Sequence, residues 1–237
     1  MVGHTPTLIK VGHRGSPRDF PGNTMQGFVR AVERGCTMVE CDIRQAADGV
    51  LVLSHDPHVT DVQNKRYKIA EHSSAELHSL NLGAGEGVPT LDELVAWSQG
   101  RCAIMADMKC EDNGIEAQVV RALAPLATDA KLVPGAGEAS RRRFRALDPQ
   151  LHLSLSLGNS ASSLLEGSRF DAFVETIDTY AVTWEHSLLN ASRIQKLHAR
   201  GLKVFAWTVD DISIMQRLIN DRVDGIISNR SDLLESL

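Results

Sequence analysis

Short apolar runs alternate with segments of helical spacing along most of this 237-residue chain. Repeated strand-then-helix units imply parallel strands joined by right-handed crossovers. About eight such units in a chain of this length favour a (β/α)8 barrel over an open doubly wound sheet. The open sheet would need a G-x-G-x-x-G loop after its first strand, and Gly12-His13-Arg14-Gly15 lacks that spacing. We therefore predict an α/β fold, a TIM barrel, as a single domain over residues 1–237.

The expected elements follow directly from these runs. Val50–Leu53 comes so soon after its predecessor that no helix fits between them, which predicts a hairpin-like excursion or a strand extension at the barrel rim. Thr24 is expected to cap the first helix and Gly35 to end it. The predicted strands are Leu8–Gly12, Met38–Ile43, Val50–Leu53, Cys102–Asp107, Lys131–Val133, Leu151–Leu155, Ala181–Trp184, Lys203–Thr208 and Gly225–Ile227. The predicted helices are Thr24–Glu33, Leu91–Trp97, Ile115–Leu126, Ala139–Leu147, Ser192–Arg200 and Ile212–Asn220.

Net charge and hydropathy argue against nucleic acid and membranes as binding partners. The formal net charge is −5, so binding of nucleic acid or of a membrane surface through a general basic field is not expected. The chain has no apolar run near the ~18 residues of a membrane span, and Met1–Lys10 does not resemble a signal peptide. We expect a cytoplasmic protein with a small-molecule ligand and no stable membrane association. The oligomeric state stays open.

The cysteines and one run of arginines are both interpreted as structural rather than functional features. The four cysteines form no C-x-x-C pair, so we expect reduced structural thiols rather than a zinc ribbon. The run Arg141-Arg142-Arg143-Phe144-Arg145 could contact an anionic partner, but a solvated helix face is the preferred interpretation.

Carboxylates at two strand ends indicate a candidate metal site. Glu40 and Asp42 are two residues apart in a strand, so they share one face and repel unless a positive charge separates them. Asp107, at the end of another apolar run, could supply a third oxygen. Hard cations such as Mg²⁺ and Ca²⁺ take such ligands. The alternative is a set of simple ion pairs, including one between Asp107 and Lys109.

Basic side chains at other strand ends suit a phosphate ester. His13 and His55 could act as general acid and general base near neutral pH, although a lone histidine at a strand end is more often structural. Arg14 offers a fork for phosphate oxygens, or else a surface salt bridge. Lys109 could stabilise charge on a phosphorane-like oxygen. Trp207 either walls the mouth of the site or fills the barrel.

These residues occur in an order that resembles the glycerophosphodiester phosphodiesterase family over nearly the whole chain. The matching motifs are His13-Arg14-Gly15, Pro21-Gly22-Asn23-Thr24, Glu40-Cys41-Asp42, Asp48-Gly49, His55-Asp56, Asp107-Met108-Lys109, Trp207-Thr208-Val209 and Asp224-Gly225-Ile226-Ile227-Ser228-Asn229.

The resemblance implies a TIM barrel that holds Mg²⁺ or Ca²⁺ through Glu40, Asp42 and Asp107. It also implies acid–base catalysis by His13 and His55, with phosphate contacts from Arg14 and Lys109. In such enzymes a glycerol hydroxyl attacks phosphorus, and water opens the resulting cyclic phosphate. The products would be glycerol 3-phosphate and an alcohol.

The chain departs from the family pattern at three places. Gly22 stands where the family's P-E-N-T box has Glu, Asp107 stands where Glu is usual, and the inserted region between Pro57 and Pro89 is short. These departures keep two alternatives open. One is the same chemistry on a sugar phosphodiester or a lysophospholipid, and the other is a barrel that binds a phosphate ligand without hydrolysing it.

Overall fold

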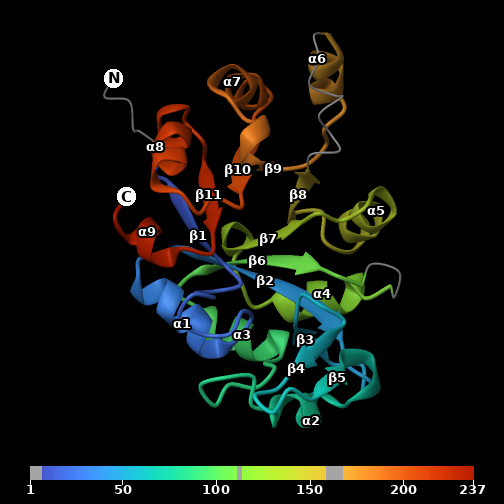
Figure 1. Cartoon of the computed structure of the whole chain (residues 1–237). Helices are drawn as coiled ribbons and strands as arrows, with labels where there is room; N and C mark the ends of the chain where they lie inside the picture. The colour runs from blue at the N-terminus through green and yellow to red at the C-terminus, as the bar shows by residue number, and fades with distance from the viewer. Residues whose placement is uncertain (1–6, 111–113, 159–167) are drawn as a thin grey trace.

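The computed structural model describes residues 7–110, 114–158 and 168–237. Within these ranges eight parallel strands form a closed barrel, in the order β1-β2-β6-β7-β8-β9-β10-β11, with β11 pairing back to β1 (Figure 1). The fold is therefore a TIM barrel, as predicted. Its strands are β1 (Ile9–His13), β2 (Met38–Gln45), β6 (Ala103–Met108), β7 (Lys131–Pro134), β8 (His152–Leu157), β9 (Ala181–Glu185), β10 (Lys203–Trp207) and β11 (Gly225–Ser228).

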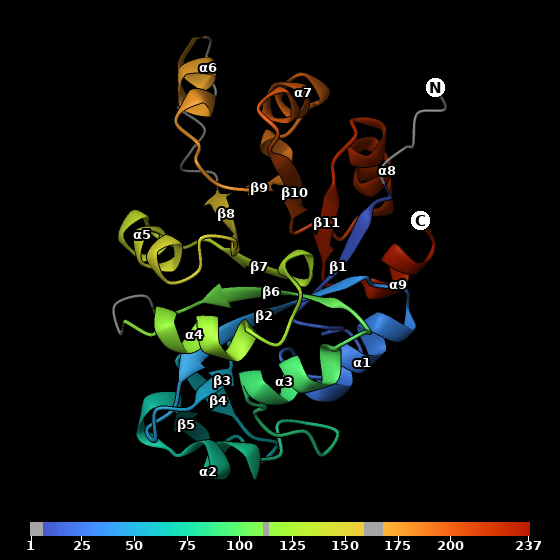
Figure 2. The same cartoon turned by 180° about the vertical axis from the view of Figure 1, so that it is seen from behind.

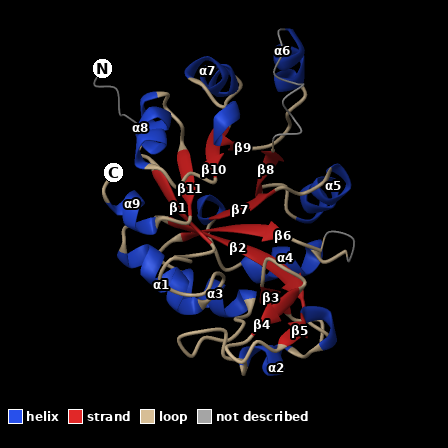
Figure 3. Ribbon diagram, viewed as in Figure 1, coloured by secondary structure: helices blue, strands red, loops and turns tan. Residues whose placement is uncertain are grey.

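Helices surround this barrel on the outside, as the view from behind also shows (Figures 2 and 3). Six of them were predicted from helical spacing, with ends displaced by at most a few residues, whereas α6 and α9 were not. The surrounding helices are α1 (Met25–Glu33), α3 (Leu91–Ser98), α4 (Glu116–Leu123), α5 (Glu138–Leu147), α6 (Ser168–Glu175), α7 (Ala191–Ala199), α8 (Ile212–Asn220) and α9 (Ser231–Glu235), with the short 3-10 turns η3 (Thr128–Ala130) and η5 (His186–Leu188).

A small insertion follows the second barrel strand. Its first strand runs antiparallel to β2, which confirms the predicted excursion at the rim. A separate two-stranded hairpin comes next and lies below β3 in Figure 1. The hairpin was not predicted from the sequence, because its strands are three residues long and largely polar. The insertion consists of β3 (Leu51–Leu53), β4 (His58–Thr60), β5 (Arg66–Lys68), η1 (Ile69–Glu71) and α2 (Ser74–His78).

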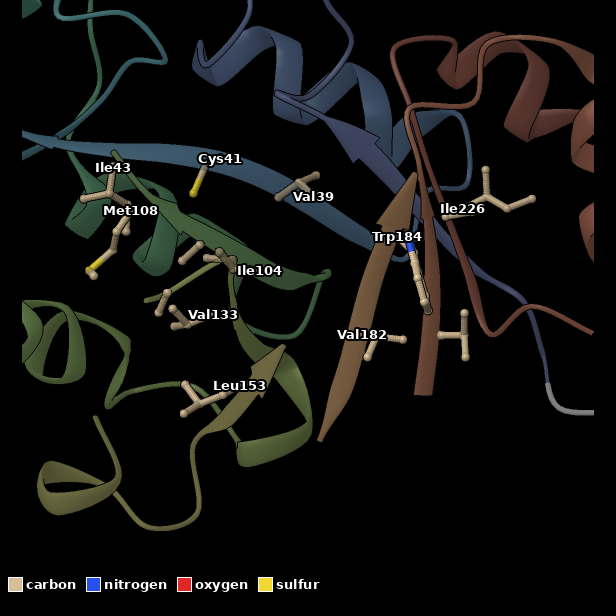
Figure 4. Close-up of a cluster of buried hydrophobic side chains, with 14 of the residues drawn as sticks. Val39, Cys41, Ile43, Ile104, Met108, Val133, Leu153, Val182, Trp184 and Ile226 are labelled. Atoms are coloured by element: carbon tan, nitrogen blue, oxygen red, sulfur yellow. The ribbon is translucent and has the colours of Figure 1, made fainter. Parts of the chain in front are cut away.

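The core has two layers that follow the alternation of side chains along each strand. Outward-facing residues, such as Val39, Ile104 and Trp184, fill the space between the barrel and its helices (Figure 4). Inward-facing residues, such as Met38 and Met105, fill the inside of the barrel. The same alternation therefore turns the functional residues further along these strands toward the barrel axis.

The first helix differs from the prediction in one detail. Thr24 occupies the N-cap position, but its hydroxyl makes no capping bond and donates instead to the Pro21 carbonyl at 2.6 Å. That bond holds the loop before the helix, so the expected cap is wrong. Gly35 ends the helix as expected: its φ is +79° and its N–H donates to the Val32 carbonyl at 2.9 Å.

Three further expectations can be compared with the structure. All four cysteines are free. No helix in the described ranges combines the length and apolar character that crossing a bilayer requires. Arg142 is exposed on α5, as a solvated face requires, whereas Arg143 pairs with the buried Glu116 of α4 at 2.6 Å. Residues 1–6, within the segment examined for a signal peptide, lie outside the described residues.

Candidate active site

Three carboxylates meet at the carboxyl end of the barrel. Glu40 and Asp42 project from β2, and Asp107 lies beside Asp42 on the neighbouring β6. One oxygen from each of the three lies within 4.8 Å of the others. Burial raises the pKa of Glu40 well above its ordinary range, and the charges of Asp42 and Asp107 raise it further. Burial also raises the pKa of Asp107, although Lys109 opposes that shift.

The surrounding polar groups leave this acidic cluster short of positive charge. The Oδ2 atom of Asp42 accepts a hydrogen bond from Asn23 Nδ2 at 2.8 Å and lies 3.1 Å from Arg14 Nε. Its Oδ1 atom lies 3.2 Å from Lys109 Nζ but is buried without a hydrogen bond among the described residues. A buried carboxylate oxygen that accepts no hydrogen bond from the described residues and lies beside two other carboxylates fits a hard divalent cation. The cluster is thus consistent with a divalent metal site formed by Glu40, Asp42 and Asp107.

The turn after β1 explains the His13-Arg14-Gly15 triplet. Arg14 has a left-handed backbone, with φ +55°, and its N–H donates to Glu40 Oε2 at 2.9 Å. Gly15 has φ +82°, and a Cβ there would lie 2.5 Å from the carbonyl carbon of Gly27. Only glycine fits this position, so the turn is held against α1 and Arg14 is directed toward the acidic cluster.

His13 is partly buried, with one ring nitrogen directed toward the acidic cluster. Its Nδ1 lies 2.7 Å from Asn229 Oδ1, an acceptor, so that nitrogen carries the proton in the neutral ring. The Nε2 lies 3.7 Å from Glu40 Oε2. Burial lowers the pKa of His13, and the positive charge of Arg14 lowers it further. The lowered pKa favours the neutral ring, in which Nε2 carries no proton and can accept one.

His55 follows β3 and is more exposed than His13. Its Nδ1 donates to Asp56 Oδ1 at 2.9 Å, which orients the ring. The guanidinium of Arg44 donates to the His55 carbonyl at 2.7 Å and 3.0 Å, and to the Lys109 carbonyl at 3.3 Å. Arg44 thus joins the loops that carry His55 and Lys109, a role that the sequence did not reveal.

Lys109 completes the charged part of the site. Its Nζ donates to Asp107 Oδ2 at 2.7 Å. Burial alone would lower the pKa of Lys109, but Asp107 and Asp42 outweigh that effect and the net shift is upward. The predicted Asp107–Lys109 ion pair is therefore present, and it lies within the site rather than apart from it.

Most of the charged groups of the site border one pocket of about 500 Å³ at the mouth of the barrel. Trp207, for which wall and core remained open, lines this pocket. Ser156 on β8 and Thr183 on β9 also line it, and their hydroxyl oxygens are 2.5 Å apart. Neither residue was predicted from the sequence, although their inward position in the alternation of β8 and β9 could have indicated them. The predicted residues that line the pocket are His13, Arg14, Glu40, His55, Asp107, Lys109 and Trp207, whereas Asp42 lies buried beneath it.

Asn23 and Asn229 were quoted only as parts of motifs, yet each has a clear structural role. Asn23, with φ +62°, donates to Asp42 Oδ2, and its Oδ1 accepts the Asp42 backbone N–H at 3.0 Å. Asn229 accepts from His13 and donates to Asp210 Oδ2 at 2.8 Å. Both asparagines therefore orient groups of the site from loops that are distant in sequence.

A pocket lined by both carboxylates and basic side chains at the carboxyl end of a closed (β/α)8 barrel places this molecule among the TIM-barrel enzymes, whose strand-end loops carry the chemistry. The model of the glycerophosphoryl diester phosphodiesterase family matches residues 13–233, and the chain belongs to this family of phosphoric diester hydrolases.

Several curated relatives match over nearly their full length. A Mycobacterium tuberculosis protein named "Probable glycerophosphodiester phosphodiesterase 2" is 29% identical and aligns with 97% of this chain and 90% of its own. A glycerophosphodiester phosphodiesterase of Caldanaerobacter subterraneus subsp. tengcongensis is 26% identical over 98% and 97% of the two chains. A phosphodiesterase of Oleispira antarctica, solved with the product sn-glycerol-3-phosphate, shares the fold, with a TM-score of 0.82, 23% identity and coverage of 98% and 96%.

Proposed function

We propose that this protein hydrolyses small glycerophosphodiesters to glycerol 3-phosphate and an alcohol, with a divalent cation as cofactor. One observation supports the proposal most strongly: two histidines, an arginine, a lysine and two of the three clustered carboxylates border the same pocket. The glycerol 3-phosphate held by the Oleispira antarctica relative supports the same product here. The predicted cytoplasmic location accords with a small polar substrate.

Glu40, Asp42 and Asp107 are the proposed metal ligands, and Mg²⁺ or Ca²⁺ is the proposed ion. When bound, such an ion offsets the repulsion among the carboxylates and supplies positive charge that polarises a phosphoryl oxygen. Arg14 and Lys109 supply further positive charge at the pocket wall, where their donors can hold the phosphate oxygens. Trp207 provides an apolar wall beside the polar groups.

His13 is the proposed general base of the first step. Its Nε2 takes the proton from the 2-hydroxyl of the glycerol moiety, whose oxygen then forms a bond to phosphorus. The bond from phosphorus to the alcohol oxygen breaks, and that oxygen receives a proton from Nε2 of protonated His55. The first step therefore releases the alcohol and leaves a cyclic glycerol phosphate.

The second step reverses the two roles. Neutral His55 takes a proton from water, and the water oxygen forms a bond to phosphorus. The bond from phosphorus to the glycerol 2-oxygen breaks, and this oxygen takes the proton that His13 received earlier. Both histidines thus return to their starting protonation states, and the product is glycerol 3-phosphate.

A panel of diesters followed by phosphorus NMR tests the proposal. We expect the purified protein to convert glycerophosphocholine to glycerol 3-phosphate, EDTA to abolish the reaction, and Mg²⁺ or Ca²⁺ to restore it. Activity that is unaffected by chelation would contradict the metal assignment. Consumption of only a sugar phosphodiester or a lysophospholipid would favour that alternative, which the short insertion motivates. Thermal stabilisation by phosphate ligands without any turnover would indicate a binding barrel.

A further inference from the structure

A second, smaller cavity adjoins the proposed active site. Its volume is about 250 Å³, and it lies between the loop that precedes α1 and the inserted β4–β5 hairpin. We call it the hairpin groove. Its lining includes Gly22, Leu53, Val59, Thr60 and Leu82, and it shares Arg14 and His55 with the larger pocket. A phosphate held at Arg14 and His55 would therefore have a cavity on each side.

The hairpin groove has the properties of a site for a small alcohol. It is smaller than the pockets that hold drug-sized ligands, which span ~300–1,000 Å³. Apolar side chains alternate in its lining with the Thr60 and Ser54 hydroxyls, and Asp56 contributes a carboxylate near the rim. His55, the proposed proton donor to the leaving oxygen, borders the groove. An alcohol in this groove would thus be next to the acid that protonates it.

The opposite side of the larger pocket has a different chemistry. In the barrel order, β8 lies opposite β1 and β9 lies opposite β2, so Ser156 and Thr183 face the strands that carry His13 and Glu40. Ser154 Oγ donates to Thr183 Oγ1 at 3.3 Å, and the Thr183 and Ser156 oxygens are 2.5 Å apart. If each hydroxyl donates to the next, Ser156 retains one hydrogen to donate into the pocket.

Gly135 keeps the space between this hydroxyl pair and the acidic cluster open. Its φ is +70°, and an added Cβ would lie 3.4 Å from both Asp107 Oδ1 and Ser156 Oγ. The pocket is therefore continuous from the acidic cluster to Ser156. A polyol attached to the phosphate can place its terminal hydroxyl against Ser156 while its neighbouring hydroxyl lies on the side of His13.

We propose that the diester lies across Arg14 and His55 with its glycerol against Ser156 and Thr183 and its leaving alcohol in the hairpin groove. This orientation rests on the proposed function and adds a direction to it. Ser156 then determines preference for the glycerol end, and the groove determines which alcohols are accepted.

The alcohol end is tested by filling the groove. Thr60 is exposed on β4, so Thr60→Trp adds bulk to the lining with little cost to folding. We expect kcat/KM for glycerophosphocholine and glycerophosphoinositol to fall about tenfold or more, and kcat/KM for the methyl ester of glycerol 3-phosphate to stay within about twofold. Val62→Trp is the matched control, because Val62 is 57% exposed just beyond β4 and does not line the groove.

The glycerol end is tested by removing one hydroxyl. Ser156→Ala should lower kcat/KM for glycerophosphocholine about three- to tenfold, the value of one hydrogen bond. The 2-hydroxyethyl ester of phosphocholine lacks the terminal hydroxymethyl group, and its kcat/KM should change by less than about twofold. A loss seen with glycerophosphocholine but not with the 2-hydroxyethyl ester would show that Ser156 contacts the hydroxymethyl group. A general disturbance of the active site would lower both values.

The two variants together distinguish the possible orientations. The proposed orientation predicts that Thr60→Trp acts only through the alcohol and Ser156→Ala only through the glycerol. A crossed pattern would show the reverse orientation, and uniform losses or no losses for either variant would overturn the proposal. If wild-type protein hydrolyses no diester at all, the proposed function fails instead, which is a separate result.

Discussion

The two ends of the barrel use charge in opposite ways. At the carboxyl end, burial raises the pKa values of Glu40 and Asp107, and the charge of Asp42 raises both further. At the amino end, the buried Asp224 accepts from His198 Nε2 at 2.7 Å, from Lys203 Nζ at 2.8 Å and from the Val204 N–H at 2.8 Å. Negative charge is thus concentrated at one end and neutralised at the other.

This difference indicates which end supports binding and which supports the fold. The clustered carboxylates Glu40, Asp42 and Asp107 repel one another and destabilise the protein until a cation binds. Relief of this repulsion adds to the free energy of cation binding. A carboxylate with three donors makes bonds that persist in the absence of any ligand. We therefore expect substitutions at the carboxyl end to affect turnover, and those at the amino end to affect stability.

The largest effect is expected for the proposed general base. His13→Ala should lower turnover ~10²–10⁴-fold, because the proton of the attacking hydroxyl loses its acceptor. The comparison variant is His198→Ala, which removes a histidine from the amino end and should leave turnover within about twofold. Steady-state kinetics on both variants measures this, and wild-type turnover in His13→Ala would exclude the residue from the mechanism.

Substitution of Asp224 is expected to reduce stability and to leave turnover unchanged. Asp224→Ala leaves the Val204 N–H without an acceptor and removes the partner of Lys203, which should reduce the free energy of unfolding by about 2–4 kcal/mol. Denaturant unfolding gives this value, and kcat of the folded fraction should remain near that of wild type. A large loss of kcat with unchanged stability would contradict the proposal that the carboxyl end supports turnover and the amino end supports the fold.

Glu40 connects the stability of the metal-free protein to pH. Its pKa is raised in the folded state, so its contribution to stability is present below the unfolded value of about 4.3 and is lost as pH rises through the folded value. Glu40→Gln should therefore raise the metal-free melting temperature at pH 7 by about 2–4 °C, equivalent to ~1 kcal/mol. Thermal unfolding with EDTA present measures this shift.

A bound metal ion should reverse this order of stability, so that wild type becomes more stable than Glu40→Gln. At a concentration 100 times its Kd, a bound cation stabilises wild type by about 2.7 kcal/mol, and Glu40→Gln should lose most of this gain together with activity. Stabilisation by Mg²⁺ or Ca²⁺ that is equal in both proteins would show that Glu40 is not a ligand.

The smallest effect is expected on metal preference when the side chain of one proposed ligand, Asp107, is lengthened. Asp107→Glu carries the carboxylate further into the pocket and away from Lys109, which narrows the space for the ion. We expect the ratio of Mg²⁺ to Ca²⁺ affinity to rise by roughly three- to tenfold, because Mg²⁺ prefers shorter ligand distances. Calorimetric titration with each ion tests this, and a fall in the ratio would contradict the interpretation of Asp107.

Most barrel elements could be predicted because their signals are local. Leu8–Gly12 and Met38–Ile43 were expected as strands and are found as β1 and β2 with ends shifted by at most two residues. The same alternation predicted that Glu40 and Asp42 share a face. The β4–β5 hairpin and helix α9 were missed because these segments are short. Helix α6 was also missed, although Phe170, Phe173 and Val174 recur at helical spacing and could have indicated it.

The orienting contacts could not be predicted because they join distant segments. His13 and Asn229 are 216 residues apart in sequence, and Arg44 reaches the Lys109 carbonyl across 65 residues. The sequence contained these residues, but no spacing rule pairs them. Their roles depend on closure of the barrel, which places the loops after β1, β2, β6 and β11 at one end.

The sequence by itself determined the barrel, the inward direction of the carboxylates and the family, because these depend on local periodicity and on the order of motifs. The tertiary structure decided how the site is oriented. It set the proton position on His13 through Asn229, placed the Ser156–Thr183 pair opposite the strands that carry His13 and Glu40, and opened the hairpin groove beside His55. These arrangements require strands and loops that are distant in sequence to meet in space.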